Sequence, residues 1–146
     1  GKYGVNFRGS DLYSKGANIL HTLRQITRDD EKWRSILRGL NKEFYHQTVT
    51  TAQIENYISN KMKYDLSTFF NQYLRDFRIP TLEYFYKDGN LNCRWINVVD
   101  NFKMPVELIV DGKKVFIEIG SSYKKIHSIS EKLKIDKDYY VFLKKI

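Results

Sequence analysis

The sequence predicts an α+β fold in which four amphipathic helices precede a small antiparallel β-sandwich. Apolar side chains recur about every 3.6 residues before Pro80 and about every second residue after it. Two tight-turn signals, Asp88-Gly89-Asn90 and Asp111-Gly112, lie in the second part, where hairpin turns need residues that accept positive φ. Because helices and strands are segregated along the chain, we expect a helical lobe over residues 1–79 and a β-sandwich domain over residues 80–146.

The first helix is expected to begin near Tyr13, after a loop over residues 1–10. Ser10 or Asp11 is expected to cap it, because a short side-chain oxygen accepts one of the free backbone N–H groups of the first turn. Its apolar face consists of Ile19, Leu20, Leu23 and Ile26. Gly16 lies inside this helix, where glycine lowers stability relative to alanine. We therefore expect another backbone to pack closely against Gly16.

Three more helices follow, each with its own start signal. Asp29 is expected to cap the second helix, and Thr50 and Gln53 to form a capping box at the third. Asp65 is expected to cap the fourth, which Pro80 should end. The apolar faces are Trp33, Ile36, Leu37, Leu40 and Phe44 in the second helix, Ile54, Ile58 and Met62 in the third, and Leu66, Phe69, Phe70, Tyr73, Leu74 and Phe77 in the fourth.

About six short strands are expected after Pro80. They are residues 81–87, 91–98, 106–110, 115–119, 124–129 and 139–146. Short alternating segments separated by turn residues are typical of a sandwich. Trp95 is expected in its core.

The run Tyr13-Ser14-Lys15-Gly16-Ala17, followed by an apolar helix, resembles the Tyr-x-Lys-Gly motif of the aminopeptidase-N-type zinc metallopeptidases. These gluzincin aminopeptidases include the leukotriene hydrolases. The resemblance extends over roughly residues 13–86, through an ordered set of short motifs: 29–33, 49–51, 65–70, 72–74 and 79–83. It implies that the helices are the C-terminal lobe of a gluzincin catalytic domain and that the strands are the β-sandwich domain that follows it.

The same resemblance implies a role for one residue, Tyr13. In the family, the tyrosine of this motif donates a hydrogen bond to the tetrahedral intermediate that forms when a zinc-bound water attacks the peptide carbonyl. A tyrosine hydroxyl keeps its proton at neutral pH, so it needs no activation for this task. Without the resemblance, Tyr13 would be interpreted as a half-buried tyrosine at a helix start. We therefore expect Tyr13 to be catalytic.

The zinc site of the family is missing from this chain. That site is H-E-x-x-H with a downstream glutamate, because two histidines one turn apart share a helix face. His21, His46 and His127 have no second histidine within five residues, and no His-Glu pair occurs. We expect no metal ligand and no cofactor-binding residue here. The chain is interpreted as the C-terminal part of a longer peptidase, whose upstream catalytic domain holds the zinc and binds the peptide substrate; alone, it should be inactive.

The other candidate residues have simpler explanations. Lys15 is interpreted as a surface or structural residue of the motif. His21 is expected to be a hydrogen-bonded structural histidine, and His46 and His127 to lie at the surface. The acidic residues 29–31 resemble a metal cluster, but their place at a helix start is explained by capping and by the helix dipole.

Composition narrows the classes of partner. The net charge is +8, of which 13 basic against 8 acidic residues give +5 before Pro80, and 12 against 9 give +3 from there on. A nucleic-acid site needs a focused basic face, and this excess is spread, so we expect no nucleic-acid partner. The chain has no apolar run long enough for a membrane segment. A soluble protein is expected, in the cytoplasm, the periplasm or outside the cell.

Two other functions stay open at this point. The motif also fits a non-catalytic interaction module that is derived from the same family and consists of helices and a β-sandwich. A degraded zinc motif in the upstream sequence would favour this alternative. A nucleic-acid-binding function would show as steeply salt-dependent association.

Overall fold

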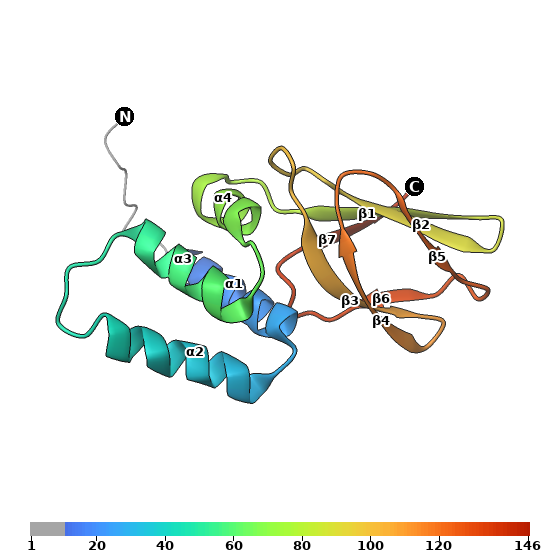
Figure 1. Cartoon of the computed structure of the whole chain (residues 1–146). Coiled ribbons are helices and arrows are strands. Elements are labelled where there is room, and N and C mark those ends of the chain that lie inside the picture. Colours follow the sequence, from blue (N-terminus) through green and yellow to red (C-terminus); the bar gives the residue numbers. More distant parts are fainter. Residues whose placement is uncertain (1–10) are drawn as a thin grey trace.

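The computed structural model describes residues 11–146, with the helices at one end of the molecule and the strands at the other (Figure 1). The described helices are α1 (Asp11–Thr27), α2 (Asp30–Glu43), α3 (Thr51–Met62) and α4 (Ser67–Arg75). The strands are β1 (Thr81–Lys87), β2 (Asn90–Ile96), β3 (Met104–Val110), β4 (Lys113–Ile119), β5 (Lys124–His127), β6 (Leu133–Ile135) and β7 (Phe142–Lys145). The predicted α+β class is confirmed, and the division into two domains stays a prediction.

The strands form two sheets, one in the order β5-β2-β1-β7 and one in the order β4-β3-β6. The pairings are antiparallel except that of β1 with β7, which is parallel. This parallel pair and strand β6 depart from the predicted antiparallel sandwich of about six strands. Three residues are too few to show a two-residue period, and a parallel pairing is set by a long connection rather than by a local turn.

Both hairpin turns form where the sequence predicts them. Asp88 and Gly89 have φ of 51° and 69°, and Asp111 and Gly112 have φ of 52° and 79°. Positive φ at both central residues matches the right-handed twist of the flanking strands. These two turns fix the registers of β1 with β2 and of β3 with β4.

The helix starts also follow their signals. Asp29 accepts a hydrogen bond from the Lys32 amide at 2.9 Å and caps α2. The Thr50 and Gln53 side chains cap each other's backbone in the predicted box at α3. The caps expected from the side chains of residues 10–11 lie outside the described part of the chain.

Helix α4 differs from its prediction at both ends. Leu66, and not Asp65, occupies the N-cap position. Asp65 lies one position earlier, and its carboxylate accepts a hydrogen bond from the Ser67 amide at 2.9 Å. The helix ends at Arg75, five residues before Pro80, so the proline does not end it.

Most of the predicted apolar faces are buried in one hydrophobic core, together with Trp95 of the sandwich. Three predicted face residues are exposed instead: Leu20 by 46%, Leu74 by 47% and Phe77 by 91%. Leu20 and Leu74 each follow a buried neighbour, Ile19 and Tyr73, and one residue rotates a helix by about 100°, so they lie at the side of the face. Phe77 lies beyond the end of the helix.

The glycine with a packing reason is Gly39 and not Gly16. A Cβ on Gly39 would meet the hydroxyl oxygen of Tyr57, so α2 and α3 approach each other there. A Cβ on Gly16 would have no heavy atom of the described residues within 4 Å, apart from those of its own helix turn. Within residues 11–146, no backbone outside α1 makes the close approach predicted for Gly16.

Buried polar groups join the helices to the sheets. The Tyr140 N–H donates to the Thr22 hydroxyl at 2.9 Å, and the Tyr73 hydroxyl donates to the Tyr140 carbonyl at 2.8 Å. Thr22 and Tyr73 are almost fully buried. The segment before β7 thus lies between α1 and α4 and bonds to both, and we call these contacts the seam.

Candidate functional site

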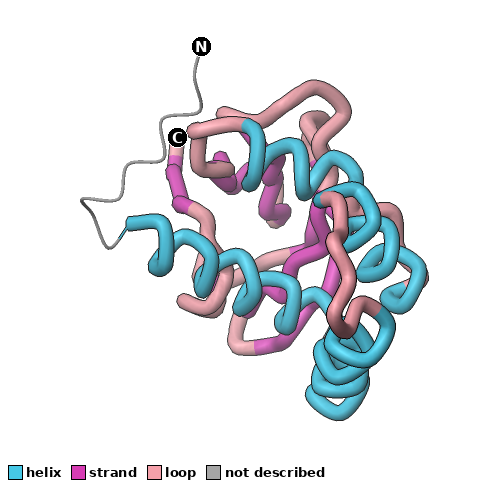
Figure 2. Tube along the Cα trace, turned by 90° about the vertical axis from the view of Figure 1, so that its left-hand side faces the viewer, coloured by secondary structure: helices cyan, strands magenta, loops and turns pink. Residues whose placement is uncertain are grey.

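Tyr13 lies in the first turn of α1, and 83% of its surface is exposed. Ala17, Leu20 and Arg24 follow it at intervals of four, three and four residues, so they share one side of the helix. Ala17 and Leu20 are exposed as well. Figure 2 shows the first turns of α1 at the edge of the helical layer. The predicted catalytic tyrosine therefore begins an open stripe, formed by Tyr13, Ala17 and Leu20.

A hollow of about 340 Å³ between α1 and α2 continues this stripe. It is lined by Ala17, Leu20, His21, Arg24, Asp30, Trp33 and Arg34. At its rim, the Arg24 guanidinium donates two hydrogen bonds to the Asp30 carboxylate, at 2.8 and 2.6 Å. This pair lowers the pKa of Asp30 and raises that of Arg24. The exposed side of α1 thus offers a phenol, a few apolar side chains and a fixed ion pair.

The three histidines are not brought together. His21 lines the hollow and is exposed, so the predicted hydrogen-bonded structural histidine is wrong; the buried polar residue of α1 is its neighbour Thr22. His46 and His127 are exposed, as predicted. Within residues 11–146, no three histidine, cysteine, aspartate or glutamate side chains lie close enough together to hold a metal ion. The expectation that this chain holds no metal ligand stays a prediction.

The first turn of α1 is tied to the segment after α4. The Lys15 ammonium donates to the Asp76 carbonyl at 3.4 Å. The Asp76 carboxylate accepts hydrogen bonds from the Arg78 amide at 2.8 Å and from its guanidinium, with the closest contact at 2.7 Å. These bonds lower the pKa of Asp76 to about 2. The structural interpretation of Lys15 therefore fits the contacts, whereas sequence analysis singles out neither Asp76 nor Arg78.

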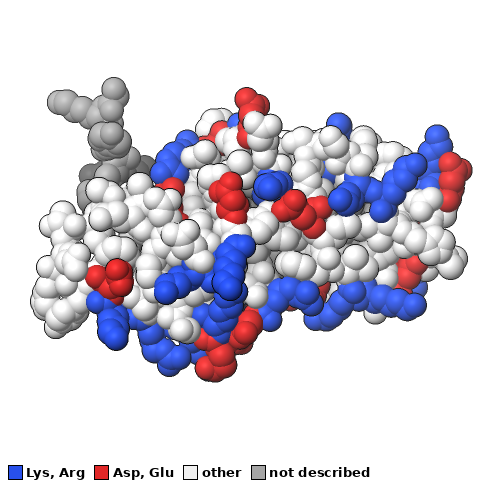
Figure 3. Space-filling view, in the orientation of Figure 1, with Lys and Arg blue, Asp and Glu red and all other residues white. Residues whose placement is uncertain are grey.

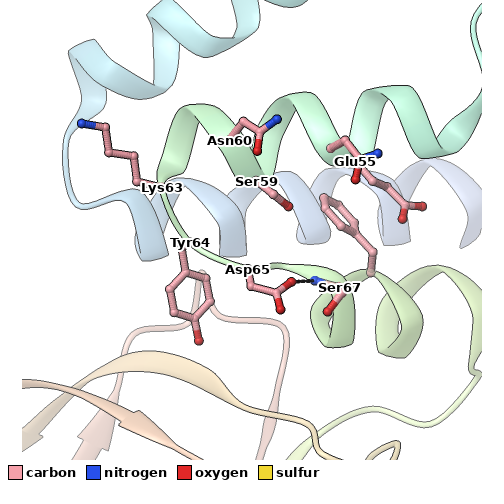
Figure 4. Close-up of a pocket in the computed structure, with 9 residues that line it drawn as sticks. Glu55, Ser59, Asn60, Lys63, Tyr64, Asp65 and Ser67 are labelled. Atoms are coloured by element: carbon pink, nitrogen blue, oxygen red, sulfur yellow. Dashed lines mark hydrogen bonds between the residues drawn. The ribbon is translucent and has the colours of Figure 1, made fainter.

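A second hollow, of about 450 Å³, lies between α3 and the start of α4 (Figure 4). Three of its polar side chains, those of Glu55, Tyr64 and Asp65, bond to other groups of the protein. Tyr64 points toward the strands and donates to Glu118 at 2.5 Å, and burial and this partner raise the pKa of Tyr64. Glu55 pairs with Arg75 at 2.6 Å. These groups hold α3, α4 and β4 together, so they do not form a reactive cluster.

Basic and acidic side chains are mixed on the face of the molecule that Figure 3 shows. Figure 3 shows lysine and arginine side chains over both the helical and the strand end of the visible face, interspersed with acidic ones. The expectation of no nucleic-acid partner stays a prediction.

Between residues 11 and 146, no helix combines the length and the apolar character needed to cross a bilayer.

No family model and no curated protein matches this sequence. Among solved structures, the chain is similar to aminopeptidase A of Legionella pneumophila, whose crystal structure contains aspartic acid. The match has a TM-score of 0.71 and covers 95% of this chain at 15% sequence identity. The chain spans 18% of that protein's length. The fold described above is thus one that occurs within an aminopeptidase.

Proposed function

We propose that this chain is the C-terminal part of a zinc-dependent, gluzincin-type aminopeptidase, which releases N-terminal residues from peptides: the helices end its catalytic domain, and the strands form the β-sandwich domain that follows. One observation carries the proposal. Tyr13 stands exposed in the first turn of a helix, at the start of a Tyr-x-Lys-Gly run, in a fold that also occurs within an aminopeptidase.

The chemical role proposed for Tyr13 is that of an oxyanion donor. Its hydroxyl donates a hydrogen bond to the oxygen of the peptide carbonyl as that oxygen gains negative charge in the tetrahedral intermediate. One such donor stabilises a transition state by about 2.7–4 kcal/mol in comparable sites. That magnitude requires a site from which water is excluded. In this chain Tyr13 is open to solvent, so the proposal needs a further part of the protein to cover it.

The stripe of Tyr13, Ala17 and Leu20 gives such a part a surface to pack on. Because no H-E-x-x-H motif occurs in the sequence and no group of three possible metal ligands lies together within residues 11–146, the proposal assigns the zinc ligands, the general base and most of the substrate contacts to the upstream part of a longer protein. The chain alone is then expected to hydrolyse nothing and to bind no stoichiometric zinc.

The test is the hydrolysis of an aminoacyl-anilide by the full-length protein, with Tyr13 and with Tyr13→Phe. We expect the substitution to lower kcat by about a hundredfold or more at unchanged zinc content. Tyr45→Phe is the control: Tyr45 is also an exposed tyrosine, in the turn that follows α2, and its substitution should leave kcat unchanged.

Each other outcome has a definite meaning. An active protein in which Tyr13→Phe is harmless would refute the role of Tyr13. A zinc-loaded protein that is inert on a range of aminoacyl-anilides would favour the non-catalytic interaction module. Tight stoichiometric zinc in the isolated chain would contradict the placing of the ligands upstream.

A further inference from the structure

The position of Tyr13 depends on how the first turn of α1 is held. That turn is at the edge of the helical layer (Figure 2). Ala17 and Leu20, which follow Tyr13 along the same side of the helix, are exposed. Lys15 is half-buried, two residues after Tyr13, and its ammonium reaches the Asp76 carbonyl at 3.4 Å. This contact links the turn to a segment 61 residues later in the chain.

The acceptor of this contact is itself fixed. Arg78 holds the Asp76 carboxylate through its backbone amide and its guanidinium, which closes a tight bend directly after α4. The carboxylate also attracts the Lys15 ammonium, since the positive charge of Lys15 contributes to lowering the pKa of Asp76. Lys15 therefore meets both a carbonyl dipole and a negative charge at the same bend.

The bend is anchored in the core through Gln72. This side chain is fully buried in α4; its amide nitrogen donates to the Arg78 carbonyl at 2.7 Å, and its amide oxygen accepts from the Val99 N–H at 2.7 Å. A continuous series of polar contacts thus runs from the sandwich through α4 and the bend to the first turn of α1. Because both ends of the buried Gln72 amide are hydrogen-bonded, the bend to which it bonds has little freedom to move.

The arrangement leaves the phenol free while holding its backbone. Two residues along a helix are about 200° apart, so the side chains of Tyr13 and Lys15 leave the helix on nearly opposite sides. Lys15 faces the bend, and Tyr13 faces solvent. Because Lys15 bonds to a carbonyl of the chain itself, its place in the fold is that of a support and not of a substrate contact.

We propose that Lys15 is a positioning residue for Tyr13: by binding the Asp76 carbonyl and its bend, it fixes where the first turn of α1, and with it the phenol, stands. This inference rests on the proposed oxyanion role of Tyr13. An oxyanion donor acts only at the position that the developing charge will occupy, and a displacement of about 1 Å lowers turnover by up to about a hundredfold.

The first experiment is kinetic and uses the full-length protein. Lys15→Met removes the ammonium and keeps the length of the side chain, and we expect it to lower kcat about tenfold or more with little change in KM. Lys15→Arg keeps a cation and a donor and should restore most of the activity. In the Tyr13→Phe background, Lys15→Met should lower kcat less than twofold further, because there is no hydroxyl left to position. Lys42→Met, at an exposed lysine of α2, is the control.

The second experiment needs no activity. Lys15→Met is expected to speed amide hydrogen exchange in residues 13–19 of this chain by about tenfold or more, with no change in the strands. Unchanged exchange there would overturn the support itself. Faster exchange with undiminished kcat, or full additivity of Lys15→Met with Tyr13→Phe, would overturn positioning while leaving the role of Tyr13 intact. If Tyr13→Phe is harmless in an active protein, the proposed role of Tyr13 and this inference fall together, while the aminopeptidase function stands and the exchange result reports only on the fold.

Discussion

Replacing Tyr73 by phenylalanine tests the seam between the helices and the sheets. The substitution keeps a ring of the same shape at an almost fully buried position and removes only the hydroxyl that donates to the Tyr140 carbonyl at 2.8 Å. The carbonyl then loses its partner at a place that water reaches poorly. Leaving a buried polar group unpaired lowers the free energy of unfolding by about 1–3 kcal/mol.

The assay is urea unfolding followed by circular dichroism. For Tyr73→Phe we expect a lower midpoint at an unchanged m-value, because the surface exposed on unfolding stays the same. For a chain of this size the loss corresponds to a fall in Tm of about 2–4 °C for each kcal/mol. Tyr45→Phe, at a tyrosine that is 71% exposed, should leave the midpoint unchanged.

The partner Thr22 sharpens this test. Thr22→Val removes the acceptor of the Tyr140 N–H, so it should also destabilise the protein by about 1–3 kcal/mol. Both substitutions remove a hydrogen bond to the backbone of Tyr140. We therefore expect the double variant to lose less free energy of unfolding than the sum of the losses of the two single variants. A Tyr73→Phe protein within about 0.5 kcal/mol of the wild type, or strict additivity of the pair, would refute a seam held at Tyr140.

Lys63 is the C-cap of α3 and has a φ of 55°, where a residue with a side chain is strained. Lys63→Gly should therefore raise the free energy of unfolding by up to about 1 kcal/mol in the same urea assay. A lower free energy of unfolding would mean that the Lys63 side chain stabilises the turn. Burial raises the pKa of the Cys93 thiol to about 11. At pH 8, a thiol reagent should therefore modify the native protein far more slowly than the urea-unfolded protein. Equal rates of modification would contradict the burial of Cys93. Asp111 accepts hydrogen bonds from Ser128, Ile129 and Ser130 that hold its pKa well below the ordinary value. Since the unfolded chain binds this proton more tightly, the stabilisation is complete above about pH 4 and is lost as the pH falls further. Asp111→Asn should therefore flatten the stability curve below pH 4, and an unaltered curve would show that another group titrates there.

The parts of the fold that the sequence predicts correctly are those that neighbouring residues determine. Asp29 caps its helix and Asp111-Gly112 turns its hairpin because a side-chain oxygen or a tolerated positive φ acts within three residues. Helical period identifies which apolar residues share a side. It does not identify how much of that side the rest of the chain covers, and for that reason Leu20 and Leu74 are exposed.

The contacts that the sequence does not predict join distant segments. Gln72 is fully buried and bonded at both ends of its amide, yet in sequence it is one polar residue on an aromatic helix. Gly39, and not Gly16, permits a close approach, since that depends on which helix carries Tyr57. For the candidate site, a motif points to Tyr13, while the Asp76 bend that faces Lys15 appears only once the fold brings the segment after α4 to the first turn of α1.

The parallel pairing of β1 with β7 determines when this fold can be completed. Thr22 and Tyr140 are 118 residues apart, and β7 is the last strand in the sequence although it pairs with the first. A chain made from its N-terminus forms its helices and hairpins from local contacts as they are synthesised. Buried polar groups of α1 and α4 then stay unpaired until the segment before β7 has been made, and closing such long loops slows folding. Among the described elements, β7 and the segment before it thus complete contacts that α1, α4 and β1 leave open.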